Sequence, residues 1–172
     1  MNLEKSLREL FPAIEFEFED SQSLSDSKFQ STVHSANIIC TATSSKYPLF
    51  KSDWVKEKTH LNLIGSYTKE MVEVEDLLIK RSKRIIVDSL EACLLEAGDL
   101  INANVDQKNL VEIGQLVDEK SELVQDEIEH VKKAGDITIF KSVGIGLQDV
   151  AIAGAVLEKA YALGVGTEIK DY

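Results

Sequence analysis

Hydrophobic and polar residues follow two different periods in the first part of this chain. Apolar residues three or four positions apart predict a short helix over residues 2–11, which Pro12 ends. In residues 14–19 apolar side chains alternate with acidic ones, a period of two that is typical of an edge strand with one charged face. A serine-rich loop over residues 21–27 and a short helix over residues 28–34 are expected next.

Short apolar runs rich in β-branched residues predict buried strands further along the chain. They cover residues 38–43, 60–65, 84–88 and 137–140. The first run, IICTAT, is continuous rather than alternating, which favours a strand covered on both faces. Helical patterns separate these runs, so the sequence predicts an α/β fold with a mainly parallel sheet.

The helical patterns themselves have recognisable apolar faces and end signals. The first predicted helix covers residues 72–82, with Val74, Leu77 and Leu78 on one face, and the second covers residues 89–98, capped by Ser89 and ended by Gly98. The third covers residues 109–133, with one apolar stripe at Leu110, Ile113 and Val117 and another at Val124, Ile128 and Val131. The fourth covers residues 147–163. The last of these is rich in alanine and glycine, whose small side chains allow close approach. We therefore expect it to be buried against another element or subunit.

Composition and charge narrow the classes of function. The chain has 172 residues and a formal net charge of -11, which disfavours binding to nucleic acid or to an anionic membrane surface. No apolar run is long enough to span a bilayer, and the N-terminus has no secretory apolar region. Cys40 and Cys93 both lie in apolar stretches, so we expect reduced, buried thiols and a cytoplasmic location.

Candidate binding residues follow two of the predicted strands. Hydroxyl side chains and free backbone N–H groups in residues 41–45 could hold a cofactor amide or ribose, because ligands of open α/β sheets gather at strand carboxyl ends. Ordinary turn chemistry explains the same residues. Tyr67, after the second strand, could donate a hydrogen bond or carry a proton, or could belong to a simple strand end.

Other candidate motifs are weaker. Gly144 and Gly146 follow a strand and open a helix, as a dinucleotide loop should, but Asp149 stands where a third glycine is expected. A carboxylate there repels a pyrophosphate, so we interpret this turn as structural. The three histidines are scattered, and none has the spacing of a metal ligand pair.

Three segments taken together resemble one known family. They are residues 36–44, residues 60–65 with Glu73 downstream, and residues 140–144 with Gln148 and Asp149. Their order and spacing are similar to the C-terminal half of the ornithine cyclodeaminase/mu-crystallin family, which includes archaeal-type alanine dehydrogenases and ketimine reductases. The resemblance extends from about residue 3 to about residue 162.

The resemblance implies a division of the chain and a set of site residues. Residues 1–140 would form an incomplete Rossmann-type domain for NAD or NADP that lacks the first βαβ unit. Residues 141–172 would belong to a substrate and dimerisation domain, which implies a homodimer. By matching position, the residues along the nicotinamide would be Thr43, Leu61, Asn62, Leu63, Ile64 and Ser142, with Val143 near a small amino-acid or imine substrate.

The departures from the family restrict the expected activity. Tyr67 stands at the position of the family's catalytic aspartate, and a phenol is no carboxylate base at neutral pH. A reductase or dehydrogenase is therefore expected rather than a cyclodeaminase. The family's glycine-rich loop and its substrate-binding lysine and arginines match nothing in this chain, so we expect the chain alone to be inactive, to bind dinucleotide weakly and to be marginally stable. The alternative is a non-catalytic homodimeric binding protein that keeps the fold.

Overall fold

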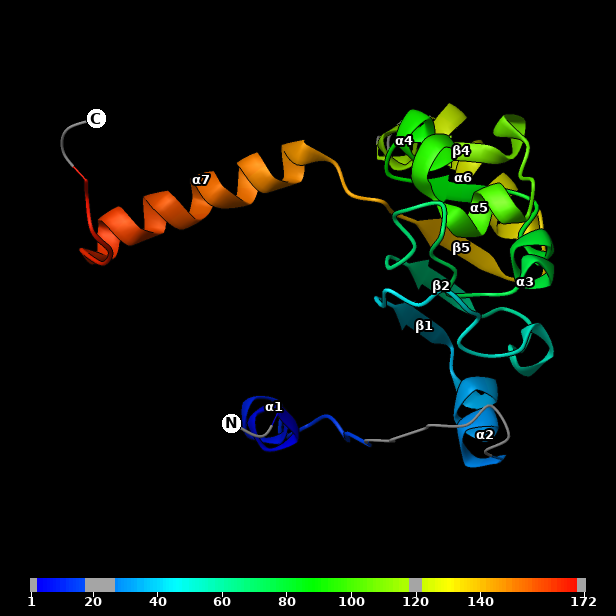
Figure 1. Cartoon of the computed structure of the whole chain (residues 1–172), viewed down its shortest axis with the longest axis horizontal. Helices are drawn as coiled ribbons and strands as arrows, with labels where there is room; N and C mark the ends of the chain where they lie inside the picture. Colours follow the sequence, from blue (N-terminus) through cyan, green and yellow to red (C-terminus); the bar gives the residue numbers. More distant parts are fainter. Residues whose placement is uncertain (1–2, 18–26, 118–121, 170–172) are drawn as a thin grey trace.

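A computed structural model describes residues 3–17, 27–117 and 122–169 of the chain (Figure 1). Its strands are β1 (Ile38–Thr41), β2 (His60–Leu63), β3 (Ile85–Val87), β4 (Leu110–Glu112) and β5 (Thr138–Lys141). Its helices are α1 (Leu3–Leu10), α2 (Ser27–Ser35), α3 (Asp76–Arg81), α4 (Leu90–Glu96), α5 (Gly98–Asn102), α6 (Glu122–Lys133) and α7 (Gly146–Leu163), with 3₁₀ turns η1 (Ser52–Trp54), η2 (Gln107–Asn109) and η3 (Ile113–Leu116).

The five strands form one parallel sheet in the order β1-β2-β5-β3-β4, which confirms the predicted α/β class. The last strand in the sequence is therefore central, and it pairs with β2 on one side and with β3 on the other. In this register Leu63 lies opposite both Thr41 of β1 and Lys141 of β5, and Val87 of β3 also lies opposite Lys141. The carboxyl ends of β1, β2, β5 and β3 thus meet at one edge of the sheet.

The hydrophobic core follows from alternation along these strands. In β2, Leu61 and Leu63 are fully buried, whereas His60 and Asn62 on the opposite face are only half-buried. The buried face joins the apolar sides of α3, α4 and α5 in one cluster, which includes Leu61, Leu63, Leu78, Ile79, Ile85, Val87, Cys93, Leu100 and Ile139. Ser89 caps α4 as predicted, by accepting a hydrogen bond from the backbone nitrogen of Ala92.

Two predicted elements are wrong. Residues 14–17 are not in a strand, and the rest of that segment lies outside the described residues. A strand needs a neighbouring backbone, and this segment lies away from the sheet beside α1 (Figure 1). The single helix expected over residues 109–133 is instead β4, η3 and α6, because Leu110 and Val111 are buried and pair with β3. The second apolar stripe is confirmed in α6, where Val131 is buried.

Smaller corrections concern strand coverage and helix ends. β1 is the edge of the described sheet, and Ile38 is 65% exposed, so this strand is not covered on both faces as its apolar run predicted. Leu77 also points to solvent, while Leu78 is buried. Gly98 directly follows Ala97, the C-cap of α4, and is the first residue of α5, and a side chain there would collide with the backbone oxygen of Met71.

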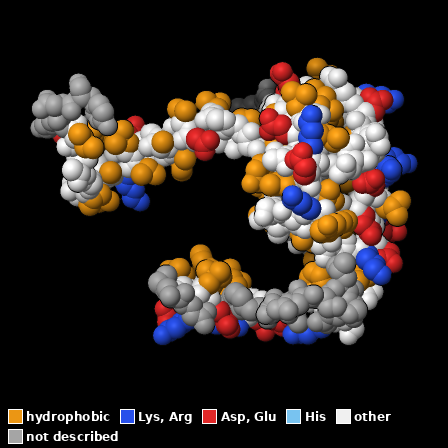
Figure 2. Space-filling view, in the orientation of Figure 1, with side chains coloured by type: hydrophobic (Ala, Val, Ile, Leu, Met, Phe, Trp, Pro, Cys, Tyr) orange, Lys and Arg blue, Asp and Glu red, His pale blue; other side chains and the backbone are white. Residues whose placement is uncertain are grey.

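Helix α7 is present as predicted but projects from the sheet instead of packing against it (Figure 1). None of its residues is buried, and its large apolar side chains, such as Val150 and Leu157, are more than half exposed. Figure 2 shows hydrophobic side chains along α7 and on α1, which projects on the same side of the molecule. No helix in the described ranges is long and apolar enough to cross a membrane.

Candidate functional site

A cleft of about 510 Å³ lies at the sheet edge where β1, β2 and β5 end. Such an edge is where open parallel sheets place their ligands, because the loops diverge there and leave space. Among the residues that the structure describes, no acidic or basic side chain lines this cleft, and its lining consists of hydroxyl, amide, glycine and apolar groups. The lining residues are Ala42, Thr43, Ser44, Ile64, Gly65, Tyr67, Ser142, Val143, Gly144 and Gln148.

Glu73 joins the first two walls of the cleft from below. Its side chain is fully buried, and its Oε1 accepts a hydrogen bond from the backbone nitrogen of Thr43 at 2.6 Å. Its Oε2 accepts from the Thr41 hydroxyl at 2.6 Å and from the backbone nitrogen of Gly65 at 2.8 Å. One carboxylate therefore holds the chain just after β1 against the chain just after β2.

Gly65 is required at this junction. A Cβ atom built on Gly65 would lie 2.0 Å from the Thr43 oxygen and 2.3 Å from Glu73 Oε1. The two backbones therefore touch directly, and no other residue fits between them without moving one of the walls.

Asp88 holds the third wall. It follows β3, and its Oδ2 accepts hydrogen bonds from the Ser142 hydroxyl at 2.6 Å and from the backbone nitrogens of Val143 and Gly144 at 3.1 and 2.8 Å. Burial opposes its ionisation, but the hydrogen bonds, with that from Ser142 the strongest, outweigh burial and lower the pKa of Asp88. The Ser142 hydroxyl donates its proton to Asp88, its oxygen accepts a hydrogen bond from the backbone nitrogen of Gly144 at 3.3 Å, and its second lone pair can accept from a ligand.

The structure brings together five of the eight predicted site residues. The cleft is lined by Thr43, Ile64, Tyr67, Ser142 and Val143. The side chains of Leu61 and Leu63 lie in the core instead. Asn62 lies on the other face of the sheet, where its amide donates to Cys40 Sγ and its oxygen contacts His60.

The sequence assigned no role to four polar residues beneath the cleft. Glu73, Asp99 and Lys141 are buried, and Asp88 is partly buried. Asp88 could have been found, because it directly follows an apolar strand and so stands at the sheet's carboxyl edge. Lys141 carried no such signal, since a lysine at the end of an apolar strand ordinarily extends into solvent.

The two cysteines differ from expectation. Cys40 is exposed on the edge strand, which makes the prediction of two buried thiols wrong for this residue. Cys93 is buried, and burial, with the nearby charge of Asp88 as a smaller contribution, raises the pKa of its thiol to about 12. Within the described residues no group of three or more His, Cys, Asp or Glu side chains is placed to hold a metal ion.

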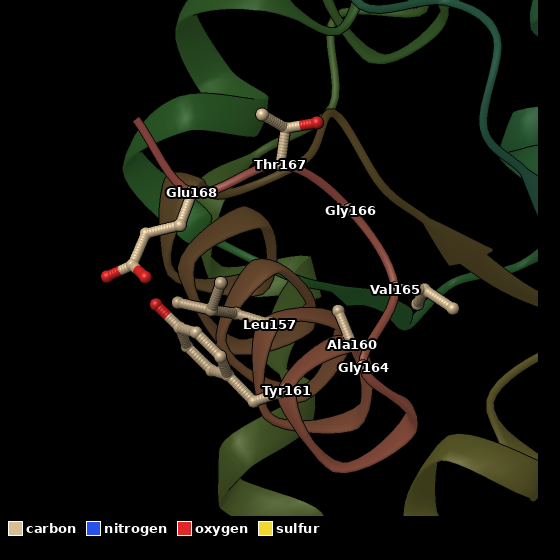
Figure 3. A pocket seen from close by; sticks show the side chains of 8 residues that line it. All are labelled: Leu157, Ala160, Tyr161, Gly164, Val165, Gly166, Thr167 and Glu168. Atoms are coloured by element: carbon tan, nitrogen blue, oxygen red, sulfur yellow. The ribbon is translucent and has the colours of Figure 1, made fainter. Parts of the chain in front are cut away.

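A second hollow, of about 290 Å³, lies at the end of α7 (Figure 3). It is formed by the last turns of α7, including Leu157 and Tyr161, and by the glycine-rich turn that follows. The Tyr161 and Glu168 side chains are its largest polar groups, and it lies far from the sheet edge. It belongs to the exposed surface of α7 and has no connection with the cleft.

Comparison with known proteins decides the family. The model of the ornithine cyclodeaminase/mu-crystallin family matches residues 4–163 of this chain. The chain belongs to that family. Among its relatives, Delta(1)-pyrroline-2-carboxylate reductase of Bacillus cereus is 35% identical over 144 residues, which are 80% of this chain and 42% of the reductase.

Solved structures of the family agree with this fold. The Thermococcus litoralis Delta(1)-pyrroline-2-carboxylate reductase, in complex with NADH and L-proline, matches with a TM-score of 0.64 and 29% identity over 81% of this chain and 42% of the enzyme. An archaeal alanine dehydrogenase dimer with bound NAD matches with a TM-score of 0.65 and 28% identity over 79% of this chain and 41% of that one. The chain thus spans less than half the length of these relatives, and the family is one of NAD(P)-dependent oxidoreductases and cyclodeaminases.

Proposed function

We propose that this chain forms the nicotinamide-binding half of an NAD(P)-dependent oxidoreductase that acts on an imine or an amino acid. The observation that carries the proposal is the cleft at the carboxyl edge of the sheet, whose walls are joined by Glu73 and Asp88. The family's solved members that hold NADH or NAD support it. We expect the 172-residue chain to be inactive on its own.

The chemistry of the cleft fits a nicotinamide ring with its carboxamide group. The Ser142 oxygen can accept from the carboxamide nitrogen, because its own proton is donated to Asp88. Thr43 Oγ1 accepts a hydrogen bond from the backbone nitrogen of Ser45, so its hydroxyl proton remains to be donated to a carbonyl oxygen. Ile64 and Val143 supply apolar contact for a planar ring. When bound, the nicotinamide supplies the hydride chemistry, and these residues orient it.

Tyr67 is the candidate for a group near the substrate. Its side chain lines the cleft and is half exposed, so a substrate entering from solvent meets the phenol. A phenol at this position can donate a hydrogen bond to a substrate carboxylate or imine nitrogen. Val143 would complete the substrate side of the pocket. A reductase or dehydrogenase is proposed over a cyclodeaminase because the phenol of Tyr67, and no carboxylate of the described residues, lines the cleft.

The Gly144 turn does not hold a pyrophosphate in this proposal. The backbone nitrogen of Gly144 already donates to Asp88, and Asp149 adds a second carboxylate in the first turn of α7. Both charges oppose a phosphate there. Because phosphate contacts contribute much of the affinity for a dinucleotide, we expect this chain to bind NADH no more tightly than it binds the mononucleotide.

We also propose a division of the chain at about residue 140. Residues 1–140 contribute the incomplete Rossmann-type unit, and residues 141–172 contribute to a substrate and dimerisation domain. The exposure of the apolar side chains of α7 supports this division, because a helix that is apolar on most of its surface is ordinarily buried in a core or an interface.

The same helix supports a second candidate function, a non-catalytic homodimeric binding protein. Sedimentation velocity of the chain and of a Leu157→Glu variant distinguishes the two. A dimer that the variant dissociates, together with no binding of nicotinamide compounds, would favour the second candidate. A monomer in dilute solution would speak against it.

Binding of reduced nicotinamide mononucleotide tests the main proposal. We expect a titration of the ¹⁵N-labelled chain to shift the backbone amide signals of Thr43, Gly65 and Val143, because these residues surround the cleft. No shift at these amides at saturating mononucleotide would overturn the proposal. NADH fluorescence in parallel should reveal weak binding, and micromolar affinity would show that a phosphate site exists after all.

A further inference from the structure

Lys141 is a fully buried lysine at the end of the central strand. Its Nζ donates hydrogen bonds to the backbone oxygen of Leu63 at 3.1 Å and to that of Ser142 at 3.0 Å. Leu63 ends β2, and Ser142 follows β5, so one ammonium group bridges two neighbouring strands where both reach the cleft.

The first of these contacts fixes the peptide group between Leu63 and Ile64. The Leu63 oxygen accepts from Lys141 Nζ and from the backbone nitrogen of Ser142, which lies 3.1 Å away. On the other end of the same peptide plane, the Ile64 nitrogen donates to the Thr41 oxygen at 3.0 Å. Since a peptide group is planar, contacts at both ends fix its orientation and that of the Ile64 side chain that follows.

The second contact fixes the peptide group between Ser142 and Val143 in the same way. Its oxygen accepts from Lys141 Nζ at 3.0 Å, and its nitrogen donates to Asp88 Oδ2 at 3.1 Å. The positive ammonium group therefore faces the carbonyl oxygen of this peptide, and the negative carboxylate faces its N–H group. Each charge is opposite to the partial charge at its end of the peptide dipole. Rotation of this plane would break both contacts at once.

Lys141 is also surrounded by acidic groups beneath the cleft. Burial lowers the pKa of Lys141, and the carboxyl groups of Asp99, Glu73 and Asp88 act in the opposite direction, with Asp99 having the largest of these effects. Asp99 is itself buried, its Oδ1 accepts from the backbone nitrogens of Glu73 and Val74, and its Oδ2 makes no hydrogen bond within the described residues. The negative charge around the ammonium group reduces the cost of burying it.

Stability alone does not account for this arrangement. Buried ions are poor sources of folding stability, because desolvation offsets most of their attraction, and an apolar side chain of similar length fills the same volume. What an apolar residue cannot do is fix two carbonyl groups at once. The carbonyls in question belong to the peptide groups that precede Ile64 and Val143, and both of these residues line the cleft.

We propose that Lys141 is a positioning residue for the cofactor cleft, whose ammonium group sets the Leu63–Ile64 and Ser142–Val143 peptide planes and with them the two apolar walls that receive the nicotinamide ring. The role of the cleft rests on the proposed function above. The geometry that Lys141 sets does not rest on that function, so the geometry and the function can be tested separately.

The test compares the full chain with a Lys141→Met variant, which keeps the length of the side chain and removes its charge and donors. We expect the midpoint of urea unfolding to fall, because two buried carbonyl oxygens lose their donor and the nearby carboxylates lose the positive charge. Hydrogen exchange of the Ser142 and Val143 amides should become about fivefold to tenfold faster, as the loss of about one hydrogen bond implies. The Thr138 amide, at the other end of β5, donates to the Thr59 oxygen and serves as the internal control. Binding of reduced nicotinamide mononucleotide should weaken by a similar factor.

Unchanged exchange at Ser142 and Val143 would overturn the positioning role, whatever the ligand does. A wild-type chain that does not bind the mononucleotide would instead overturn the proposed function, and Lys141 would then have no ligand to position. If Lys141→Met does not fold, side-chain ¹⁵N spectra of the wild-type chain still decide the question. Ammonium protons of Lys141 that exchange far more slowly than those of exposed lysines are expected, and rapid exchange would contradict the proposal.

Discussion

The carboxylate of Glu73 lies 2.6 Å from the backbone nitrogen of Thr43 and holds it against Gly65, whose own nitrogen is 2.8 Å from the same side chain. Because Thr43 and Gly65 both line the cleft, this buried acid sets the distance between two of its walls. These two walls consist of backbone atoms, and the Glu73 carboxylate that holds them together is buried away from solvent.

Glu73→Gln should loosen this junction. Three donors converge on the carboxylate, and an amide nitrogen in place of one oxygen would face a donor instead of accepting from it. We expect a loss of about 2–4 kcal/mol in the free energy of unfolding, since at least one buried donor is left without a partner. Urea unfolding followed by circular dichroism measures this loss.

Glu75→Gln is the matched control for that experiment. Glu75 accepts two hydrogen bonds from Ser52, from its backbone nitrogen and its hydroxyl, both at 2.6 Å, but it does not line the cleft. Its replacement should cost stability without changing the amide signals of Thr43 and Gly65. Equal changes at those two amides in both variants would show that Glu73 has no special relation to the cleft.

Gly65→Ala should be among the most damaging small substitutions in the chain. The added methyl group would lie 2.0 Å from the Thr43 oxygen, so one backbone has to move. We expect destabilisation of about 2–4 kcal/mol, because overpacking here cannot be relieved by a side-chain rotation. Thermal unfolding monitors the change.

Gly154→Ala provides the comparison, because nothing lies within 4 Å of a Cβ at this position in the middle of α7. Alanine favours a helix interior over glycine by about 1 kcal/mol, so this variant should unfold at the same temperature as the wild type or higher. A Gly65→Ala protein as stable as Gly154→Ala would contradict the close approach of the two backbones.

Asp88 should make the stability of the protein sensitive to acid. Its pKa in the folded chain lies below the ordinary value of 3.8, because hydrogen bonds to its ionised form outweigh the effect of burial. A carboxyl group of this kind contributes its full stability above pH 3.8 and loses that contribution as the pH falls through its lower folded value. Denaturant midpoints across this acidic range should therefore fall more steeply in the wild type than in Asp88→Asn. Parallel curves for the two proteins would show that Asp88 is not held as described.

The two thiols should react at very different rates. Cys40 is exposed, whereas Cys93 is buried and the pKa of its thiol is raised to about 12, so little thiolate is present at neutral pH. A thiol-specific chromogenic reagent should label one cysteine rapidly in the native chain and both after unfolding. Cys40→Ser should remove the rapid phase, and rapid labelling that survives this substitution would place Cys93 nearer the surface than described.

The sequence predicted the secondary structure well where the signal was local. The strands at Ile85–Val87 and Thr138–Lys141 and the Ser89 cap were predicted because apolar runs and a capping residue are local signals. The strand at Leu110–Glu112 was missed, because Leu110 also fits a helical spacing with Ile113 and Val117, and its strand character comes from pairing with β3.

The candidate site was predictable only in part, for a related reason. Thr43 stands at a strand end, and the rule that ligands gather there located it, whereas Ser142 was expected from the family resemblance. Glu73 and Lys141 act on that edge from the buried interior, through backbone atoms far away in the sequence. No local pattern marks such residues, because their role depends on which strands become neighbours.

The position of β5 has a consequence for how the sheet forms. It follows the other four described strands in the sequence, yet it lies between β2 and β3, which do not pair with each other. Without residues 138–141, the described strands form two separate pairs, β1 with β2 and β3 with β4. The described sheet is therefore continuous only when β5 lies between the two pairs, and this non-local pairing is of the kind that slows folding.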